Sequence, residues 1–318
     1  MIEWLDPGDD AVAEMEAVNQ TVTEMLADER PPEEIGAEAT REIRRRGEGW
    51  LGAIVTVESA TTRSIETEQG PIEVRIIAPD DPSAVYLHLH GGGFVLGGAD
   101  QQDALLDRIA ERANVAVVSV EYRLAPEHPF PAGPDDCEAA ASWLIDHAEN
   151  EFGTDRLLIG GESAGAHLAA LTLLRLRDRR GTVEPFAAAN LVFGIYDLGQ
   201  TPSTRRWDDR NPLLASSTMA WFNDCFTPGL SDEERRDPAI SPLYADLGDL
   251  VPALFTVGTE DPLLDDSLFM GARWRAAGNP TEVVVFPGAP HGFIAFPTQL
   301  GREGLRRQVE FLTHHAHR

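Results

Sequence analysis

The middle and end of the chain alternate between short apolar runs and longer amphipathic stretches. The apolar runs are residues 84–90, 115–122, 156–161, 187–195, 253–258 and 281–286. Between most of them lie stretches with helical periodicity, such as 102–113, 140–150 and 166–180. Near-continuous apolar strands that alternate with helices predict a mostly parallel sheet with helices on both faces. The expected fold class is therefore α/β.

Two regions depart from this alternation. Residues 9–28 and 32–47 have helical periodicity and are separated at Pro31-Pro32. Residues 199–240 form an insert with aromatic side chains at helical spacing, a pattern more often due to packing than to a ligand site. Because open α/β sheets bind ligands beyond the carboxyl ends of their strands, we expect the insert and the N-terminal helices to form a cap. The expected division is 1–48 (cap), 49–198 (core), 199–240 (inserted cap) and 241–318 (core).

The segment between the N-terminal helices and the first buried strand has β-like alternation. Residues 53–59, "AIVTVES", and residues 63–79 both alternate apolar and polar positions. The "EQGP" at 68–71 interrupts the second segment with turn-forming residues. This arrangement predicts a hairpin before the parallel part of the sheet.

Composition narrows the function classes. The chain has 318 residues, of which 42% are hydrophobic, enough for one large α/β core. Its formal net charge is −27, and all 26 basic residues are arginine. A surface that binds nucleic acid or an anionic membrane needs clustered basic side chains, so neither partner is expected.

The N-terminal segment, the lengths of the apolar runs and the two cysteines favour a cytoplasmic protein. The N-terminal "MIEWLDPGDD" has neither the basic nor the apolar region of a signal peptide, and no apolar run is long enough to cross a membrane. Cys137 and Cys225 lie far apart without metal-ligand spacing, which favours reduced thiols.

The first chemical motif is "GESAG" at residues 161–165. It directly follows an apolar run and precedes a helical stretch, which is the context of a nucleophile elbow. The glycines are needed because the serine backbone is strained and the helix and strand approach closely. The alternative is a tight turn in which Ser163 has no chemical role.

The second motif is "HLHGGGF" at residues 88–94, also at a strand end. Three consecutive glycines let backbone N–H groups approach a ligand, as acyl transfer requires for a developing oxyanion. The alternatives are a flexible loop and a loop that binds phosphate. A dinucleotide-binding motif is disfavoured because it leads straight into a helix, whereas here the helical stretch starts only at residue 102. His88 and His90 also suggest a metal pair, which is disfavoured because no carboxylate or cysteine is spaced to complete it.

Two further strand ends carry an acid and a histidine. The strand at 253–258 leads into "TEDPLLDD", and the strand at 281–286 leads into a loop that bears His291. Ser163, Asp261 and His291 follow the chain order Ser…Asp…His of an α/β-hydrolase. A surface-loop histidine without function is the alternative for His291.

The acid-rich turn offers four candidates for the third member. Asp261 comes just past the strand, and in an extended segment the side chain of Glu260 points the opposite way. Asp265 and Asp266 precede the helical stretch 267–278 and are expected to cap it. Asp261 is therefore the predicted acid.

Taken together, five segments closely resemble the bacterial esterases related to hormone-sensitive lipase, which have an α/β-hydrolase fold. The segments are "HGGGF", "YRLAPEHPFPA" at 122–132, "GESAG", "EDPLLDD" and "PHGF". The resemblance runs from about residue 85 to 296 and is weaker in the N-terminal helices and the insert. It implies that Ser163 attacks an ester carbonyl, His291 is general base and acid, and Asp261 orients His291.

The resemblance also implies the remaining parts of the site. The oxyanion donors are expected to be the backbone N–H groups of Gly91, Gly92 and Ala164, with His90 bracing the loop. The resemblance further implies a cap built from the N-terminal region and the insert, and often a homodimer. No cofactor or metal ion is expected.

This chain departs from the family at two positions beside the nucleophile. Glu162 stands where Asp or Thr is common, and Ala166 where Gly is often found. Both leave the triad unchanged, so the leading prediction is a carboxylesterase for small-molecule esters with short acyl groups. An amidase, formamidase or lactonase with the same triad is an alternative. A small-molecule receptor is disfavoured because related plant gibberellin receptors lack the histidine that His291 supplies.

Overall fold

A nine-stranded sheet forms the centre of the computed structural model, which describes every residue except 1, 28, 50–51, 182, 208–211 and 318. The strand order is β1-β9-β8-β7-β6-β4-β5-β3-β2. Neighbours from β1 to β5 in this order are parallel, and the pairs β5–β3 and β3–β2 are antiparallel. The strands are β1 (Ile2–Trp4), β2 (Thr61–Thr67), β3 (Gly70–Ile77), β4 (Ala84–Leu89), β5 (Val115–Val120), β6 (Leu157–Glu162), β7 (Phe186–Val192), β8 (Ala253–Glu260) and β9 (Thr281–Pro290).

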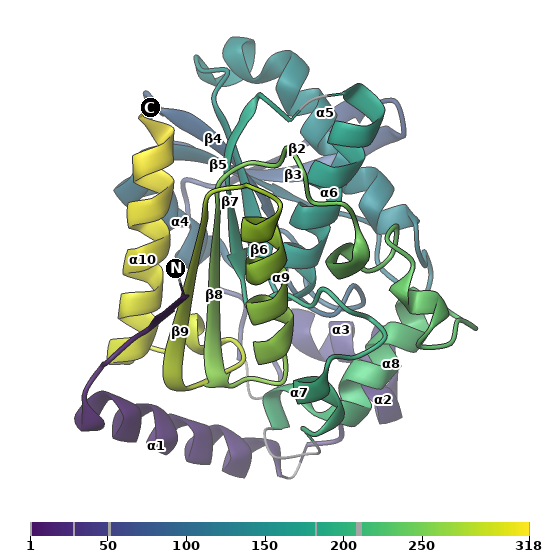
Figure 1. Cartoon of the computed structure of the whole chain (residues 1–318), viewed down its shortest axis with the longest axis vertical. Helices are drawn as coiled ribbons and strands as arrows, with labels where there is room; N and C mark the ends of the chain where they lie inside the picture. The colour runs from purple at the N-terminus through teal and green to yellow at the C-terminus, as the bar shows by residue number, and fades with distance from the viewer. Residues whose placement is uncertain (1, 28, 50–51, 182, 208–211, 318) are drawn as a thin grey trace.

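Helices cover both faces of the sheet (Figure 1). Helices α4 (Asp103–Ala113) and α10 (Gln299–Ala316) pack together on one face. The other face carries α5 (Ala132–Phe152), α6 (Ala164–Arg180) and α9 (Leu264–Ala276). No helix in the described part of the chain is both long and apolar enough to cross a membrane.

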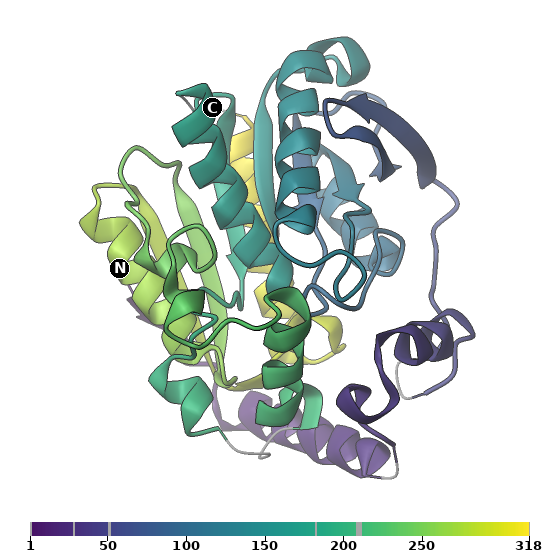
Figure 2. The ribbon, with the colours of Figure 1, turned by 90° about the vertical axis from the view of Figure 1, so that its right-hand side faces the viewer.

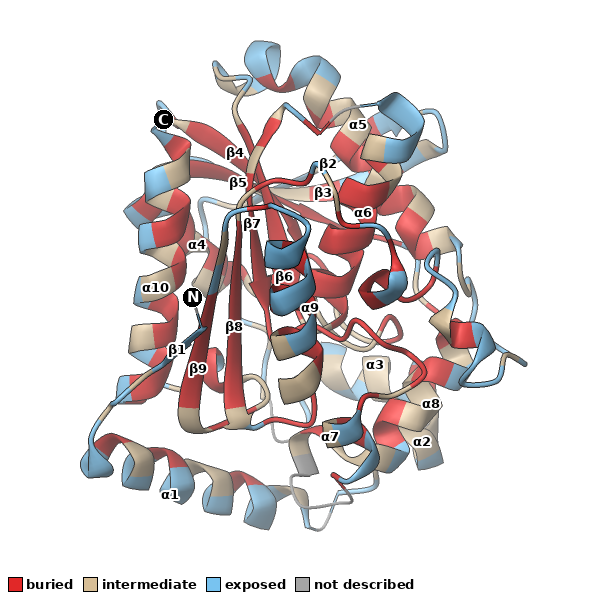
Figure 3. Cartoon of the chain, in the orientation of Figure 1, coloured by how far each residue is buried: buried red, intermediate tan, exposed pale blue. Residues whose placement is uncertain are grey.

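Burial explains why the apolar runs became the central strands. Every residue of β4, β5 and β6 is buried, so side chains on both faces of these strands need apolar surroundings (Figure 3). The peripheral strand β2 alternates instead, with most of its residues exposed or half-buried. The predicted mostly parallel sheet with helices on both faces is confirmed.

The remaining helices gather at the end of the sheet where β8 and β9 finish (Figures 1 and 2). They are α1 (Asp9–Leu26), α2 (Pro32–Ile35), α3 (Ala37–Arg45), α7 (Pro202–Arg205) and α8 (Ser216–Phe226). Helices α2 and α8 are in contact, and Thr218 Oγ1 donates a hydrogen bond to Glu33 Oε2 at 2.9 Å. The N-terminal region and the insert therefore meet in space. Residues 208–211 of the insert lie outside the described residues.

Two of the local predictions before residue 80 were wrong in detail. The single helix expected over 32–47 is divided at Gly36, whose φ of 84° is unsuited to a continuous helix. The β-like segment 53–59 is not a strand, and the backbone N–H of Val57 donates to Asp103 Oδ2 rather than to a neighbouring strand. The hairpin is confirmed as the antiparallel pair β2–β3.

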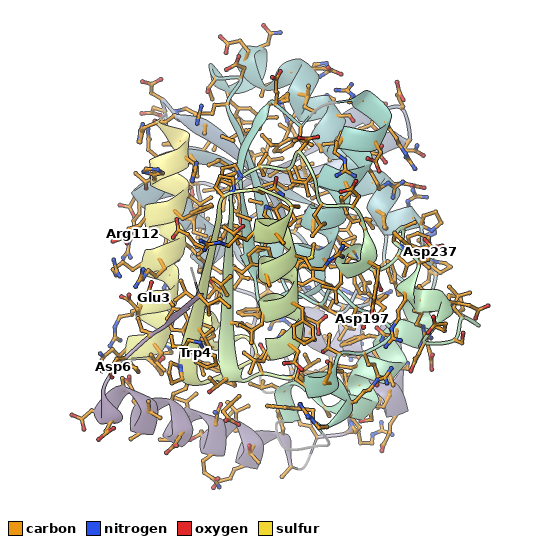
Figure 4. The ribbon with its side chains drawn as sticks, viewed as in Figure 1. Glu3, Trp4, Asp6, Arg112, Asp197 and Asp237 are labelled. Atoms are coloured by element: carbon orange, nitrogen blue, oxygen red, sulfur yellow. The ribbon has the colours of Figure 1, made fainter. Side chains whose placement is uncertain are left out.

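Strand β1 closes one edge of the sheet. Its residues pair in parallel register with β9, and the N–H of Leu5 continues the pairing to Val285 O at 3.0 Å. Glu3 forms an ion pair with Arg307 of α10, while the side chain of Trp4 remains exposed (Figure 4). A three-residue strand has no periodicity to recognise, so the sequence did not predict it.

Candidate active site

Ser163 lies at the sharp turn between β6 and α6. Its backbone is held at φ 57° and ψ −118°, and its N–H donates to Val192 O at 2.9 Å. A Cβ at Gly161 or Gly165 would come within 2.0 or 1.8 Å of the carbonyl oxygen of Leu89. The flanking glycines are therefore required by the close approach of β4, and the serine occupies a strained backbone region.

His291 and Asp261 approach Ser163 from the ends of two neighbouring strands. Asp261 follows β8 and His291 follows β9. The hydroxyl of Ser163 lies 3.1 Å from His291 Nε2, and His291 Nδ1 lies 2.9 Å from Asp261 Oδ2. The structure thus brings all three predicted side chains into one hydrogen-bonded chain.

The environments of the three groups differ. Asp261 is fully buried, and its second oxygen, Oδ1, accepts the N–H of Leu263 at 2.8 Å. The ring of His291 packs edge-on against Phe193 with centroids 4.7 Å apart. Ser163 remains partly accessible. An accessible hydroxyl, a packed imidazole and a buried carboxylate are the arrangement that proton transfer away from a serine requires.

The glycine loop after β4 lies beside the elbow. A Cβ on Gly91 would sit 2.9 Å from Glu162 O and 3.5 Å from Ser163 Cβ, so Gly91 is in close contact with the turn that bears Ser163. Gly92 has a φ of 118°, a conformation that side chains disfavour. Ala164 begins α6, where the first N–H groups of a helix have no partner within the helix.

His90 supports this loop. Its Nδ1 donates to Gly91 O at 2.8 Å, and its ring stacks on Tyr122 with centroids 4.2 Å apart. The hydroxyl of Tyr122 in turn donates to His90 O at 2.8 Å. Burial lowers the pKa of His90 to about 4, so the ring is neutral near pH 7. These contacts fit a brace rather than a proton carrier.

A small apolar cavity of about 30 Å³ adjoins Ser163. Its lining residues are Gly93, Phe94, Ser163, Ile195, Leu214, Met219, Phe222, Asn223 and Leu263. A larger cavity, of about 360 Å³, borders residues 97–101 but includes none of the three hydrogen-bonded side chains. The small cavity is therefore the candidate substrate pocket, because Ser163 lines it.

The insert's aromatic stripe divides between packing and this pocket. Phe226 is buried and stacks on Phe94 with centroids 4.0 Å apart, as expected for packing. Phe222 and Met219 instead line the cavity, and the ring of Phe222 lies against Gly93. The sequence showed the stripe, but its periodicity did not reveal which members face Ser163.

The side-chain caps expected from Asp265 and Asp266 were wrong, although both acids lie in the first turn of α9, where a carboxylate suits the helix dipole. Neither side chain caps α9. Asp265 Oδ2 accepts the N–H of Ser203 in α7, while the buried Asp266 accepts the N–H of Tyr196 at 2.6 Å and the hydroxyl of Thr201 at 2.7 Å. Burial raises the pKa of Asp266 to about 7. Both acids therefore connect the core to the start of the insert.

The fold and the arrangement of the site define a class. A serine on a strand-to-helix elbow, with an acid and a histidine following later strands of a mostly parallel sheet, is the arrangement of α/β-hydrolases. Residues 86–295 match the family described as alpha/beta hydrolase fold. The chain belongs to this family, within its group related to hormone-sensitive lipase.

Relatives and solved structures agree with this assignment. The chain is 34% identical to an ethyl acetate hydrolase from Pseudomonas putida over 268 residues, 81% of each protein. An esterase from the archaeon Pyrobaculum calidifontis is 28% identical, with a TM-score of 0.81 over 95% of this chain and 98% of that one. A thermostable carboxylesterase cloned from a metagenomic library is 29% identical, with a TM-score of 0.78 over 90% of this chain and 98% of that one.

Proposed function

We propose that the protein is a serine carboxylesterase that hydrolyses small esters with short acyl groups. The observation that carries this proposal is the hydrogen-bonded chain from Ser163 Oγ through His291 to Asp261, with separations of 3.1 and 2.9 Å. The similarity to an ethyl acetate hydrolase supports an ester as the substrate.

The first half-reaction forms an acyl-enzyme. His291 Nε2 accepts the hydroxyl proton as Ser163 Oγ attacks the ester carbonyl carbon. The imidazolium that forms is stabilised by the buried carboxylate of Asp261, which also holds Nδ1–H in place. The tetrahedral intermediate then collapses, the bond to the alcohol oxygen breaks, and His291 returns the proton to the leaving alcohol.

The same groups serve the second half-reaction. Water replaces the alcohol and attacks the acyl carbon while His291 accepts its proton. The bond from the acyl carbon to Ser163 Oγ then breaks, His291 returns the proton to that oxygen, and the carboxylic acid is released. In both intermediates the carbonyl oxygen becomes negative. We assign its stabilisation to the backbone N–H groups of Gly91, Gly92 and Ala164, which lie at the loop and the helix start beside the nucleophile.

The pocket supports the preference for short acyl groups. Its volume of about 30 Å³ is small and its walls are almost entirely apolar. A cavity of this size accommodates only a few heavy atoms, because even one water molecule needs at least ~10–15 Å³ of such volume. Phe222 and Met219 line this cavity and limit the space beside Ser163.

We also propose that residues 1–48 and 199–240 act together as a cap over the site. The hydrogen bond between Thr218 and Glu33 joins the two parts. Arg41 of α3 donates from Nε to Val95 O at 2.7 Å and from Nη2 to Ala125 O at 2.5 Å. These bonds connect the N-terminal region to the segments that follow β4 and β5.

We place the protein in the cytoplasm, where both unpaired cysteines, Cys137 and Cys225, would stay reduced. The homodimer implied by the resemblance remains a prediction. Light scattering of the purified chain across a concentration series tests it directly.

One set of assays tests the reaction. The wild-type protein is incubated with p-nitrophenyl esters of increasing acyl length, with matching anilides, with lactones and with a fluorophosphonate probe. We expect fast hydrolysis of acetyl and butyryl esters and labelling of Ser163. Ser163→Ala should lower kcat by about 10⁴- to 10⁶-fold without changing Tm by more than about 2 °C. Faster turnover of anilides or lactones would favour those activities instead.

A further inference from the structure

A buried histidine and a buried carboxylate meet beneath the elbow and take no part in the reaction described above. His88 is fully buried, and Glu162 is 3% exposed. Glu162 Oε2 lies 2.9 Å from His88 Nε2, and His88 Nδ1 lies 2.9 Å from the hydroxyl of Ser119. An ionised carboxylate only accepts hydrogen bonds, so Nε2–H donates to Glu162.

The three side chains form a row across β5, β4 and β6. His88 is in register with Ser119 of β5 and with Gly160 of β6. Side chains two residues apart on a strand share a face, so Glu162 lies on the same face as Gly160 and His88. A Cβ at Gly160 would lie 2.5 Å from the hydroxyl of Tyr86, so the strands are closely packed at this point.

This pair is a costly way to stabilise a sheet. Burying a carboxylate requires hydrogen bonds to both oxygens, yet Glu162 Oε1 has no partner among the described residues. Apolar side chains of similar volume often stabilise a core as well as a buried ionic pair does. A role beyond packing is therefore worth testing.

The position of the pair suggests that role. Gly91 and Gly92 come three and four residues after His88, and Ala164 comes two residues after Glu162. The oxyanion donors assigned above thus lie in segments that follow two different strands, β4 and β6. The hydrogen bond from His88 to Glu162 joins these strands at the point where each leaves the sheet.

We propose that His88 and Glu162 are positioning residues that hold the two halves of the oxyanion hole in register. This inference rests on the proposed esterase function. Displacement of catalytic groups by about 1 Å can cost about 10²-fold in rate. The oxyanion is fully formed only near the transition state, so the loss should fall on kcat and leave KM nearly unchanged.

Three substitutions of Glu162 separate position from charge. Glu162→Gln keeps the length of the side chain and an oxygen that accepts Nε2–H, so we expect kcat within about threefold of wild type. Glu162→Asp keeps the charge but withdraws it by one methylene, and Glu162→Leu removes the acceptor. Both should lower kcat by about 10- to 100-fold, with KM within about threefold.

Gln308→Leu is the matched control. Gln308 is fully buried and accepts a hydrogen bond from Asn190 at 3.0 Å, but it joins α10 to β7 rather than β4 to β6. We expect it to lower Tm while kcat stays within about twofold of wild type. A variant that is only less stable should therefore keep its kcat, which distinguishes it from Glu162→Leu and Glu162→Asp.

The outcomes are distinct. Wild-type kcat in folded Glu162→Leu or Glu162→Asp would overturn the proposal, as would an equal kcat loss in Gln308→Leu. Activity retained in Glu162→Asp but lost in Glu162→Gln would assign the effect to charge and also overturn it. If Glu162→Leu does not fold, the Asp and Gln variants still decide. Failure of the proposed function has a different signature, since the wild type itself would then not hydrolyse esters.

Discussion

Replacing Asp261 with Asn tests the orienting role of the acid with little change in shape. In the wild type, Oδ1 accepts the N–H of Leu263 at 2.8 Å and Oδ2 faces His291 Nδ1 at 2.9 Å. The Asn oxygen is needed at the Leu263 N–H, which turns the amide NH₂ toward His291. Nδ1 must then accept, so Nε2 carries the proton and can no longer take one from Ser163.

The expected loss follows from this change of tautomer. A triad histidine held in the wrong tautomer costs about 10⁴-fold in kcat, equivalent to about 5.4 kcal/mol of transition-state stabilisation. The assay is the steady-state hydrolysis of p-nitrophenyl acetate, with the melting temperature measured on the same preparations. Because the amide is nearly isosteric, we expect Tm to fall only slightly.

Asp265→Asn is the control for the neighbouring acid. Asp265 accepts the N–H of Ser203 at 2.8 Å, whereas His291 Nδ1 lies against Asp261 Oδ2. An amide oxygen still accepts this bond, although less strongly than a carboxylate, so the cost should be about 1 kcal/mol in stability. Activity should change by less than about threefold. A folded, inactive Asp265→Asn beside an active Asp261→Asn would refute the assignment of the acid.

Two further variants test the pocket and the buried acid. Phe222→Ala should raise the ratio of kcat/KM for hexanoyl esters to kcat/KM for acetyl esters by about tenfold or more. The reason is that each newly buried methylene group contributes up to about 0.8 kcal/mol. An unchanged ratio would count against Phe222 as a wall of the pocket. Burial raises the pKa of Asp266 from 3.8 to about 7, so the folded state binds more protons between these values and its stability should fall as pH rises from about 4 to about 7. Asp266→Asn should flatten this dependence in pH-resolved denaturation curves, and an unchanged slope would contradict the stated cause.

Much of the fold follows directly from local sequence patterns. The buried strands β4, β5 and β6 are apolar at every position or nearly so because both faces of the sheet are covered. The elbow is equally local, since only glycine fits where Gly161 and Gly165 meet the backbone of β4. The strands β8 and β9 continue past the apolar runs at 253–258 and 281–286, to Glu260 and Pro290, but Ser163, Asp261 and His291 still follow the carboxyl ends of their strands, as predicted. Their distances agree with the prediction, and their catalytic roles remain to be tested.

Other features depend on contacts between segments far apart in the chain. Asp265 and Asp266 stand at the start of a helix, and sequence spacing predicted caps for it. Hydrogen-bond donors from the insert, on Thr201 and Ser203, reach these carboxylates only after the chain folds. The strand β1 likewise exists because β9 offers it an open edge.

The pocket and the pair of His88 and Glu162 also could not be predicted from the sequence alone. Periodicity placed Phe222 and Phe226 on one helix, but only packing decided that one lines the cavity while the other stacks on Phe94. His88 and Glu162 lie in separate motifs, and the register of β4 against β6 brought them together. Backbone conformation depends mainly on residues near in sequence, so short sequence patterns predict it. The contacts of a buried side chain depend on which distant segment of the chain packs against it.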